Sequence, residues 1–152
     1  MNLRLRIPPL AVASFAAGLS WFTAHLVPAV NFEFPGRVEL AATIGLLGVI
    51  FSVLGVVSFR RARTTVNPLT PDATTALVVS GVYRVTRNPM YLGFLLFLLA
   101  EIVWLAHPVA LLVGPAFVLY LNRYQIVPEE DALQTRFGAE FQTYATQVRR
   151  WI

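Results

Sequence analysis

Four long hydrophobic runs, separated by short polar segments, dominate the chain. They cover about residues 8–30, 37–59, 89–106 and 109–127. Each run is close to the ~20 apolar residues that an α-helix needs to cross a bilayer. The pattern predicts an all-α, polytopic membrane protein in which residues 1–152 form one domain. Because His107-Pro108 separates the last two runs tightly, we expect them to form a helical hairpin.

The first run has two interpretations. Arg4 and Arg6 precede it, and Ala11-Val12-Ala13 resembles the small-residue cleavage site of a secretory signal peptide. The run is also about the length that a transmembrane helix requires. We therefore expect a retained first span.

Small residues and turn signals mark the region after the first span. Three glycines of the second run would let a neighbouring helix approach closely: Gly45, Gly48 and Gly55. Residues 64–75 are polar, and Asn67-Pro68 and Pro71-Asp72 predict turns there. The apolar patch Leu77-Val78-Val79 is too short to span. We expect it to rest on the membrane surface or to line a site.

The C-terminal region, about residues 129–151, predicts an amphipathic helix that lies on the membrane or folds over the mouth of the bundle. Its apolar positions recur at spacings of three and four residues: Leu133, Phe137, Phe141, Tyr144, Val148 and Trp151. Glu129, Glu130 and Asp131 fall in its first turn, where the helix dipole favours acidic side chains. The predicted fold is thus about four transmembrane helices plus a C-terminal amphipathic helix.

Composition supports the membrane assignment and excludes several kinds of chemistry. The chain is 57% hydrophobic and only 13% charged, whereas a soluble domain has about 25% charged residues. It has no cysteine, which excludes disulfides, thiolate nucleophiles, cysteine-ligated metals and prenylation of this chain. Its two histidines, His25 and His107, are too few for us to expect a zinc site. We expect no metal and no nucleic-acid partner.

The net charge is +4, and arginine supplies all of the positive charge, because the chain has no lysine. The predicted spans place only Arg37 on one side of the membrane. The remaining arginines fall on the other: Arg4, Arg6, Arg60, Arg61, Arg63, Arg84, Arg87, Arg123, Arg136, Arg149 and Arg150. By the positive-inside rule, both termini and residues 80–93 are expected in the cytoplasm.

Residues 80–93 are the most promising ligand-binding stretch. Asn88 is suited to cap a helix, and Pro89 is suited to the first helical position. Two tyrosines and two arginines accompany this helix start: Tyr83, Arg84, Arg87 and Tyr91. Together with free backbone N–H groups they favour an anionic or zwitterionic ligand. The same side chains are also typical of topology determinants, lipid-headgroup contacts and interfacial aromatic belts.

Carboxyl groups offer further hypotheses. Glu129 and Glu130 either complement the dipole of their helix or face the arginines of residues 80–93 and close a cytoplasmic pocket. Glu101 lies inside the third run and Glu39 near the outer end of the second. Carboxylates inside a membrane are costly and often functional. They are the basis of an alternative function, a non-enzymatic small membrane transporter or lipid-binding protein.

An ordered motif series adds a family resemblance. It consists of Gly81-Val82-Tyr83, then Arg87-Asn88-Pro89-Met90-Tyr91-Leu92-Gly93, then Glu129-Glu130 with Leu133 and Phe137-Gly138. In order, spacing and membrane context the series resembles the isoprenylcysteine carboxyl methyltransferase and phospholipid methyltransferase group of integral membrane enzymes. The resemblance covers about residues 65–151. Two departures concern the substrate. Arg-Asn-Pro replaces the Arg-His-Pro of the eukaryotic prenylcysteine enzymes, and Gln125, with Arg123 close by, stands where those enzymes carry a substrate-contacting arginine.

The resemblance implies S-adenosylmethionine as methyl donor and S-adenosylhomocysteine as product. The residues it implies for cofactor binding are Leu77, Val78, Gly81, Tyr83, Arg87, Asn88, Pro89, Met90, Tyr91 and Glu129. Those it implies for catalysis are Glu129, Glu130 and Arg123. The expected acceptor is lipophilic or membrane-associated: an isoprenylcysteine carboxylate, a phospholipid amine or a small thiol. The expected setting is a bacterial inner membrane, with membrane lipids as partners.

The chemistry of these residues fits such a reaction. Methyl transfer from a sulfonium is an in-line displacement that needs no metal, and holding the reactants in line supplies ~7–11 kcal/mol in favourable cases. A helix start and Arg87 can bind the donor's carboxylate, and Glu129 can bind a hydroxyl or amino group. An amine acceptor must lose a proton, for which Glu129, Glu130 and Glu101 are candidates. The chain has no Gly-x-Gly-x-x-Gly motif, so Rossmann-type cofactor binding is not expected.

Overall fold

The computed structural model describes residues 5–63 and 75–152, and within these ranges the protein is helical with no strand. The longer helices are α1 (Pro9–Leu26), α2 (Arg37–Arg61), α3 (Pro89–Leu105), α4 (Val113–Leu121), α5 (Val127–Phe137) and α6 (Ala139–Gln147). Short helical turns are η1 (Pro28–Val30), η3 (Gly81–Arg84), η4 (Pro108–Leu112) and the π-helical turn η5 (Asn122–Ile126). Arg4 and the turns expected at Asn67-Pro68 and Pro71-Asp72 lie outside the described residues.

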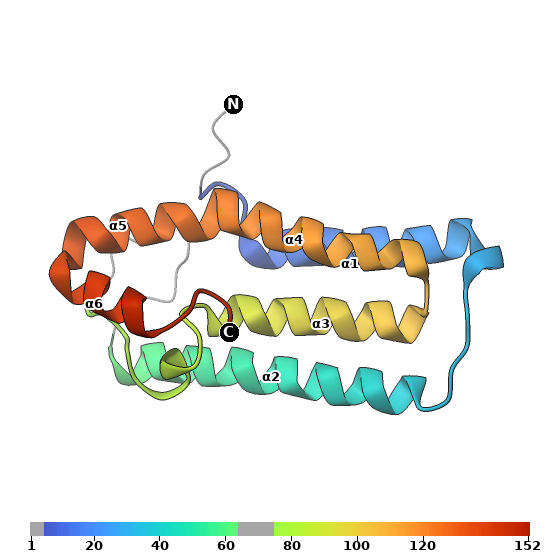
Figure 1. Ribbon diagram of the computed structural model, residues 1–152, viewed down its shortest axis with the longest axis horizontal. Helices are drawn as coiled ribbons and strands as arrows, with labels where there is room; N and C mark the ends of the chain where they lie inside the picture. The colour runs from blue at the N-terminus through green and yellow to red at the C-terminus, as the bar shows by residue number, and fades with distance from the viewer. Residues whose placement is uncertain (1–4, 64–74) are drawn as a thin grey trace.

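The helices form an elongated bundle with α3 at its centre (Figure 1). α2 packs along one side of α3, and α1 and α4 pack along the other side and against each other. An apolar core fills the space between α1, α3 and α4, with Leu98, Ile102, Phe117 and Leu121 nearly inaccessible to solvent. The first hydrophobic run is therefore an integral part of the bundle.

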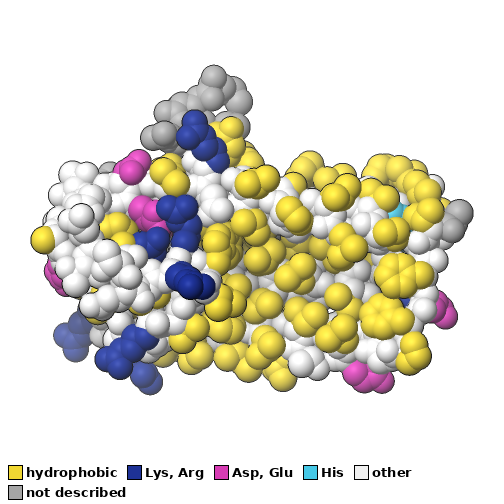
Figure 2. Space-filling model, in the orientation of Figure 1, with side chains coloured by type: hydrophobic (Ala, Val, Ile, Leu, Met, Phe, Trp, Pro, Cys, Tyr) yellow, Lys and Arg dark blue, Asp and Glu magenta, His cyan; other side chains and the backbone are white. Residues whose placement is uncertain are grey.

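Length and composition confirm the predicted polytopic, all-α membrane protein. Three helical stretches are long and apolar enough to cross a bilayer: Pro9–Leu26, Arg37–Arg61 and the continuous stretch Pro108–Phe137. α3 is apolar and slightly shorter, with 17 residues. The face of the bundle drawn in Figure 2 is largely hydrophobic. The exposed hydrophobic side chains of the described residues include Phe15, Leu46 and Leu119. Such a surface suits lipid chains rather than water.

Glycines bring α2 and α3 into close contact. A Cβ atom added at Gly48 would lie 3.0 Å from the carbonyl oxygen of Gly93. A Cβ atom added at Gly93 would lie 2.8 Å from the carbonyl oxygen of Gly48 and would overlap Oγ of Ser52. Gly55 meets the start of α3 in the same way, at Met90. The expected packing role is confirmed for Gly48 and Gly55, whereas Gly45 has only an ordinary contact of 3.7 Å with Ala100.

The C-terminal region differs from the single helix expected over residues 129–151. α5 is the direct continuation of α4 through the turn η5. Pro128 has no N–H to offer the carbonyl of Tyr124 four residues earlier, and its ring crowds that carbonyl. The helix widens here, and the N–H of Leu5 donates to the carbonyl of Tyr124 instead, at 3.0 Å. Glu129 and Glu130 lie in the first turn of α5, as predicted, but α5 continues from η5 and is not a free helix start.

Gly138 ends this long helix and redirects the chain. Its backbone, at φ 52° and ψ −120°, is in a region that side-chain-bearing residues rarely adopt. α6 then folds back and ends at Gln147, where Val148 takes up an extended conformation. We call residues 148–152 the C-terminal strap. The strap ends beside the start of α3 (Figure 1).

Candidate functional site

Nearly all arginines of the described residues gather at one end of the bundle, where α2 ends and α3 begins, while Arg37 lies at the other end. Figure 2 shows this arginine-rich end beside an otherwise hydrophobic face. The grouping of arginines expected from the sequence is thus present. The side of the membrane on which this end lies stays a prediction.

A second apolar cluster supports the loop before α3. Tyr83 is buried in η3, and Val78 and Tyr144 are buried beside it, with Leu77 partly buried against them. The hydroxyl of Tyr144 donates to the carbonyl of Tyr83 at 2.7 Å. Gly81, at φ 62°, lets the chain turn into η3. The predicted residues of this loop therefore pack against α6.

The start of α3 agrees only partly with the sequence. Pro89 occupies the first helical position and Asn88 the position before it, as expected. The side chain of Asn88, however, makes no capping hydrogen bond. Its Nδ2 donates to the carbonyl of Arg150 at 2.9 Å, and its backbone N–H donates to Oγ1 of Thr86 at 3.1 Å. Asn88 thus binds the C-terminal strap, and the expected side-chain cap is wrong.

The first turn of α3 contacts the start of α5 through a carboxyl group. The hydroxyl of Tyr91 donates to Oε1 of Glu129 at 2.5 Å, and Nε2 of Gln125 donates to the same oxygen at 2.5 Å. Gln125 lies in the π-helical turn and Glu129 follows it in the first turn of α5, and both side chains meet Tyr91 or its hydrogen-bond partner at the start of α3. π-helical turns occur frequently at functional sites.

Glu129 lies beyond the fourth span predicted from the sequence, about residues 109–127. The stretch Pro108–Phe137 has 30 residues, or about 45 Å at 1.5 Å per residue, whereas the hydrocarbon core is about 30 Å thick. Burial of the carboxyl group raises the pKa of Glu129 to about 7, against the lowering effect of the hydrogen bonds from Tyr91 and Gln125. Glu129 therefore changes its protonation near neutral pH, as a group that binds a cation or moves a proton would.

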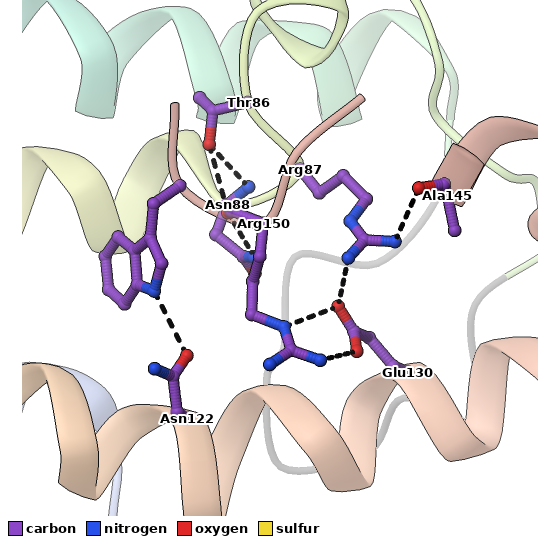
Figure 3. Close-up of polar contacts among 8 residues, drawn as sticks. Thr86, Arg87, Asn88, Asn122, Glu130, Ala145 and Arg150 are labelled. Carbon is purple, nitrogen blue, oxygen red and sulfur yellow. Dashed lines mark hydrogen bonds and ion pairs between the residues drawn. The ribbon is translucent and has the colours of Figure 1, made fainter. Parts of the chain in front are cut away.

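Glu130 is held differently, between two arginines (Figure 3). Its Oε1 lies 3.0 Å from a terminal nitrogen of Arg87. Nε and a terminal nitrogen of Arg150 donate to its two oxygens at 3.1 and 2.6 Å. The hydrogen bonds and charge of Glu130 also raise the pKa of Arg150. Both oxygens of this carboxylate are thus already engaged by arginine side chains.

Arg87 has one polar atom left over. One of its terminal nitrogens binds Glu130, and the other donates to the carbonyl of Ala145 at 3.5 Å. Its Nε is buried and has no hydrogen-bond partner among the described residues. A buried donor without a partner is costly and suggests that a ligand atom is bound there.

The structure brings most of the predicted site residues together, but not all of them. Met90 packs beside Gly55 and is half-buried. Arg123 lies on the π-helical turn with its side chain exposed, and its catalytic assignment stays a prediction. Glu39 is exposed at the opposite end of the bundle. Glu101 lies near the C-terminal end of α3, with Oε2 buried and without a hydrogen-bond partner among the described residues.

Sequence reasoning missed three residues of this region as site residues: Thr86, Arg150 and Trp151. Nε1 of Trp151 donates to Oδ1 of Asn122 at 3.0 Å, and Oγ1 of Thr86 donates to the carbonyl of Arg150 at 3.3 Å. The spacing of apolar residues gave no signal for them, because Trp151 continues the three- and four-residue spacing of the region.

Residues 37–140 match the family described as phospholipid methyltransferase. The match covers α2, α3, α4 and α5. This chain belongs to that family. The C-terminal strap lies beyond the matched residues.

Similar proteins carry names of the same group. A "Probable protein-S-isoprenylcysteine O-methyltransferase" of Oryza sativa subsp. japonica is 32% identical over 131 residues, 82% of this chain and 67% of that protein. "Protein-S-isoprenylcysteine O-methyltransferase B" of Arabidopsis thaliana is 28% identical over 106 residues, 70% of this chain and 54% of that protein. An uncharacterized protein of Haemophilus influenzae is 44% identical over 63 residues, 41% of this chain and its own whole length. No solved structure matches the chain.

Family and fold together identify an integral membrane methyltransferase of the isoprenylcysteine and phospholipid methyltransferase group. Within the described residues, no group of three or more His, Asp or Glu side chains is placed to hold a metal ion. The site between α3 and α5 lies inside the matched residues and contains the titratable carboxyl group Glu129.

Proposed function

We propose that the protein transfers a methyl group from S-adenosylmethionine to a lipophilic or membrane-associated acceptor. The observation that carries this proposal is the partly buried carboxyl group of Glu129, held by Tyr91 and Gln125 directly opposite the start of α3. A group of this kind, at the end of an apolar bundle in a methyltransferase family, is suited to recognise a polar donor beside a membrane.

The residues present fit S-adenosylmethionine. The free Nε of Arg87 is suited to its carboxylate, and the carboxylate of Glu129 is suited to its amino group. Tyr83 and Val78 supply apolar surface near this position. When bound, S-adenosylmethionine supplies an electrophilic methyl group. The protein's own task is then to orient the donor and the acceptor and to exclude water, without a covalent intermediate.

The acceptor would come from the bilayer. The site lies where α3 and the α4–α5 helix leave the apolar part of the bundle. A lipophilic acceptor whose chain lies among the exposed hydrophobic side chains would bring its polar head to this level. The need for a base depends on the acceptor: a carboxylate or a thiolate is already ionised, whereas an amine must lose a proton. Of the two neighbouring acids, Glu129 is suited to accept that proton, because Glu130 is committed to Arg87 and Arg150.

Calorimetry with S-adenosylhomocysteine on the purified full-length chain in nanodiscs tests donor binding. We expect binding to the wild-type protein and a loss of about tenfold or more in affinity for Glu129→Ala, which corresponds to about 1.4 kcal/mol. Glu140→Ala, which removes an exposed acid on α6, is the matched control and should bind normally. Absence of binding to folded wild-type protein would overturn the proposal.

A labelled methyl donor identifies the acceptor. Incubation with a total membrane lipid extract, followed by mass spectrometry of the labelled product, should distinguish isoprenoid carboxylates, phospholipid amines and thiols. Protein that binds the donor but labels no lipid, lipidated peptide or small thiol would contradict the catalytic part of the proposal.

A further inference from the structure

The C-terminal strap crosses the proposed donor site and is bound on both of its sides (Figure 3). On the α3 side, Nδ2 of Asn88 donates to the carbonyl of Arg150 at 2.9 Å. On the α4 side, the indole N–H of Trp151 donates to Oδ1 of Asn122 at 3.0 Å. The strap therefore ties the start of α3 to the α4–α5 helix at the level of the site.

Arg150 is the strap residue that makes contacts in both directions. Its guanidinium donates to both carboxylate oxygens of Glu130, at 3.1 and 2.6 Å, and its carbonyl accepts from Asn88. A two-point contact between guanidinium and carboxylate fixes direction as well as distance. Arg150 thus links the Glu130 carboxylate to the start of α3, to which the strap is also held by the hydrogen bond from the backbone N–H of Arg87 to the carbonyl of Arg149, at 3.0 Å.

This arrangement reaches Arg87. Oε1 of Glu130, already bound by Arg150, lies 3.0 Å from a terminal nitrogen of Arg87. The other terminal nitrogen of Arg87 is directed to the carbonyl of Ala145. With both ends of the guanidinium fixed, the buried Nε is held in one direction. Two arginines around one carboxylate leave a net positive charge, which favours an anionic group of a ligand.

We infer that Arg150 is a positioning residue of the methyl-donor site. Through Glu130 it orients Arg87 for the carboxylate of the donor, and through its carbonyl it holds Asn88 and the start of α3. The inference rests on the proposed function. Arg150 itself acts on ligand affinity through these neighbours and does not touch the reacting atoms.

Three substitutions and a control separate this role from simple anchoring of the strap. Arg150→Ala removes the contact with Glu130, and Arg150→Lys keeps the charge but not the two-point geometry. Trp151→Phe removes the hydrogen bond to Asn122 and leaves Glu130 in place. Arg61→Ala removes an exposed charge at the same end of the bundle. Each full-length variant is titrated with S-adenosylhomocysteine, and its thermal unfolding is followed without ligand.

We expect Arg150→Ala to raise the dissociation constant about tenfold and Arg150→Lys to recover only part of the loss. Trp151→Phe should lower the unfolding temperature with little change in affinity, and Arg61→Ala should change neither. In a Glu130→Gln background, Arg150→Ala should cost less affinity than in wild type, because the pair it acts through is already weakened.

Wild-type affinity in folded Arg150→Ala would overturn the inference while leaving the proposed function intact. The inference would also be overturned if, in Arg150→Ala and Trp151→Phe, the loss of affinity were proportional to the drop in unfolding temperature. Such a result would indicate that Arg150 only anchors the strap. If Arg150→Ala does not fold, Arg150→Lys is used in its place. The inference is then overturned if Arg150→Lys binds with full affinity and if Glu130→Gln lowers the affinity as much in Arg150→Lys as in wild type. Absence of binding to wild type would overturn the proposed function and the inference together.

Discussion

The hydroxyl of Tyr91 and the carboxyl group of Glu129 are joined by a hydrogen bond of 2.5 Å, although 38 residues separate them in sequence. The bond connects the first turn of α3 to the first turn of α5. It brings the two parts of the motif series into direct contact. The first part supplies a phenol donor, and the second supplies the carboxyl group that accepts from it.

Replacing Tyr91 with Phe should weaken donor binding while preserving the fold. The substitution removes one of two donors to Glu129, and since that hydrogen bond lowers the pKa of Glu129, its loss should raise the pKa above 7. We expect affinity for S-adenosylhomocysteine to fall about three- to tenfold at pH 7, as for a lost hydrogen bond of about 1 kcal/mol. Calorimetry measures this change.

Tyr120→Phe is the matched control. It also removes one phenol oxygen, but that oxygen is buried without a hydrogen-bond partner among the described residues. We expect unchanged affinity and an equal or higher unfolding temperature. Equal affinities of the two variants would contradict a role for the Tyr91 hydroxyl.

Donor affinity should rise with pH between about 6 and 8. Glu129 has its pKa raised to about 7 by burial, so it is largely neutral at pH 6 and largely ionised at pH 8. A positively charged amino group of the ligand favours the ionised form, and binding therefore releases a proton. Proton linkage limits the expected gain over this range to about tenfold. Titrations at pH 6, 7 and 8 measure it.

Glu129→Gln provides the check on this dependence, because it has no titrating group at the position. We expect weaker binding with a flat profile between pH 6 and 8. A profile with the same slope as wild type would show that another group is responsible.

The same group affects the stability of the protein without ligand. At a pH between the ordinary carboxyl pKa and about 7, Glu129 takes up a proton on folding. Its contribution to stability should thus fall as the pH rises through that range.

The bundle could be predicted from the sequence because its determinants are local. The length of each hydrophobic run predicted the spans, and Pro89 predicted the start of α3. Gly48 and Gly55 predicted the close packing of α2 against a neighbouring helix, which is α3. The same holds for the motif residues Tyr91 and Glu129, whose side chains meet in the structure. Each of these signals depends on residue type within one short segment.

The contacts of the C-terminal region could not be predicted in this way, because they depend on competition between distant partners. Asn88 is a good capping residue, yet its side chain binds the carbonyl of Arg150, 62 residues later. Glu129 and Glu130 look like acids at a helix start, but the helix is continuous through the turn before Pro128. Neighbouring positions in sequence then acquire different roles, since Glu129 receives neutral donors and Glu130 receives two arginines.

Gly93→Ala should destabilise the bundle. The added methyl group would overlap Oγ of Ser52 and lie 2.8 Å from the backbone carbonyl of Gly48, which cannot move independently of α2. Overpacking of this kind typically costs about 1–3 kcal/mol. Gly45→Ala, on the same helix pair, meets Ala100 at an ordinary 3.7 Å and should be tolerated. Thermal unfolding in detergent compares them, and equal unfolding temperatures would contradict the close packing.

Asn88→Ala should release the C-terminal strap without shortening α3. The side chain of Asn88 makes no capping hydrogen bond, so its removal should leave the helix content measured by circular dichroism unchanged. The strap would lose the 2.9 Å hydrogen bond to the carbonyl of Arg150 and keep the weaker one from Thr86 and the 3.0 Å bond from the backbone N–H of Arg87 to the carbonyl of Arg149. Hydrogen exchange of residues 148–152 should become faster, and donor affinity should fall with it.

Asn88→Asp should have a larger effect, because its carboxylate has no hydrogen to donate and would face the carbonyl oxygen of Arg150. Loss of helix content with unchanged exchange in the strap would instead indicate that Asn88 acts as a helix cap.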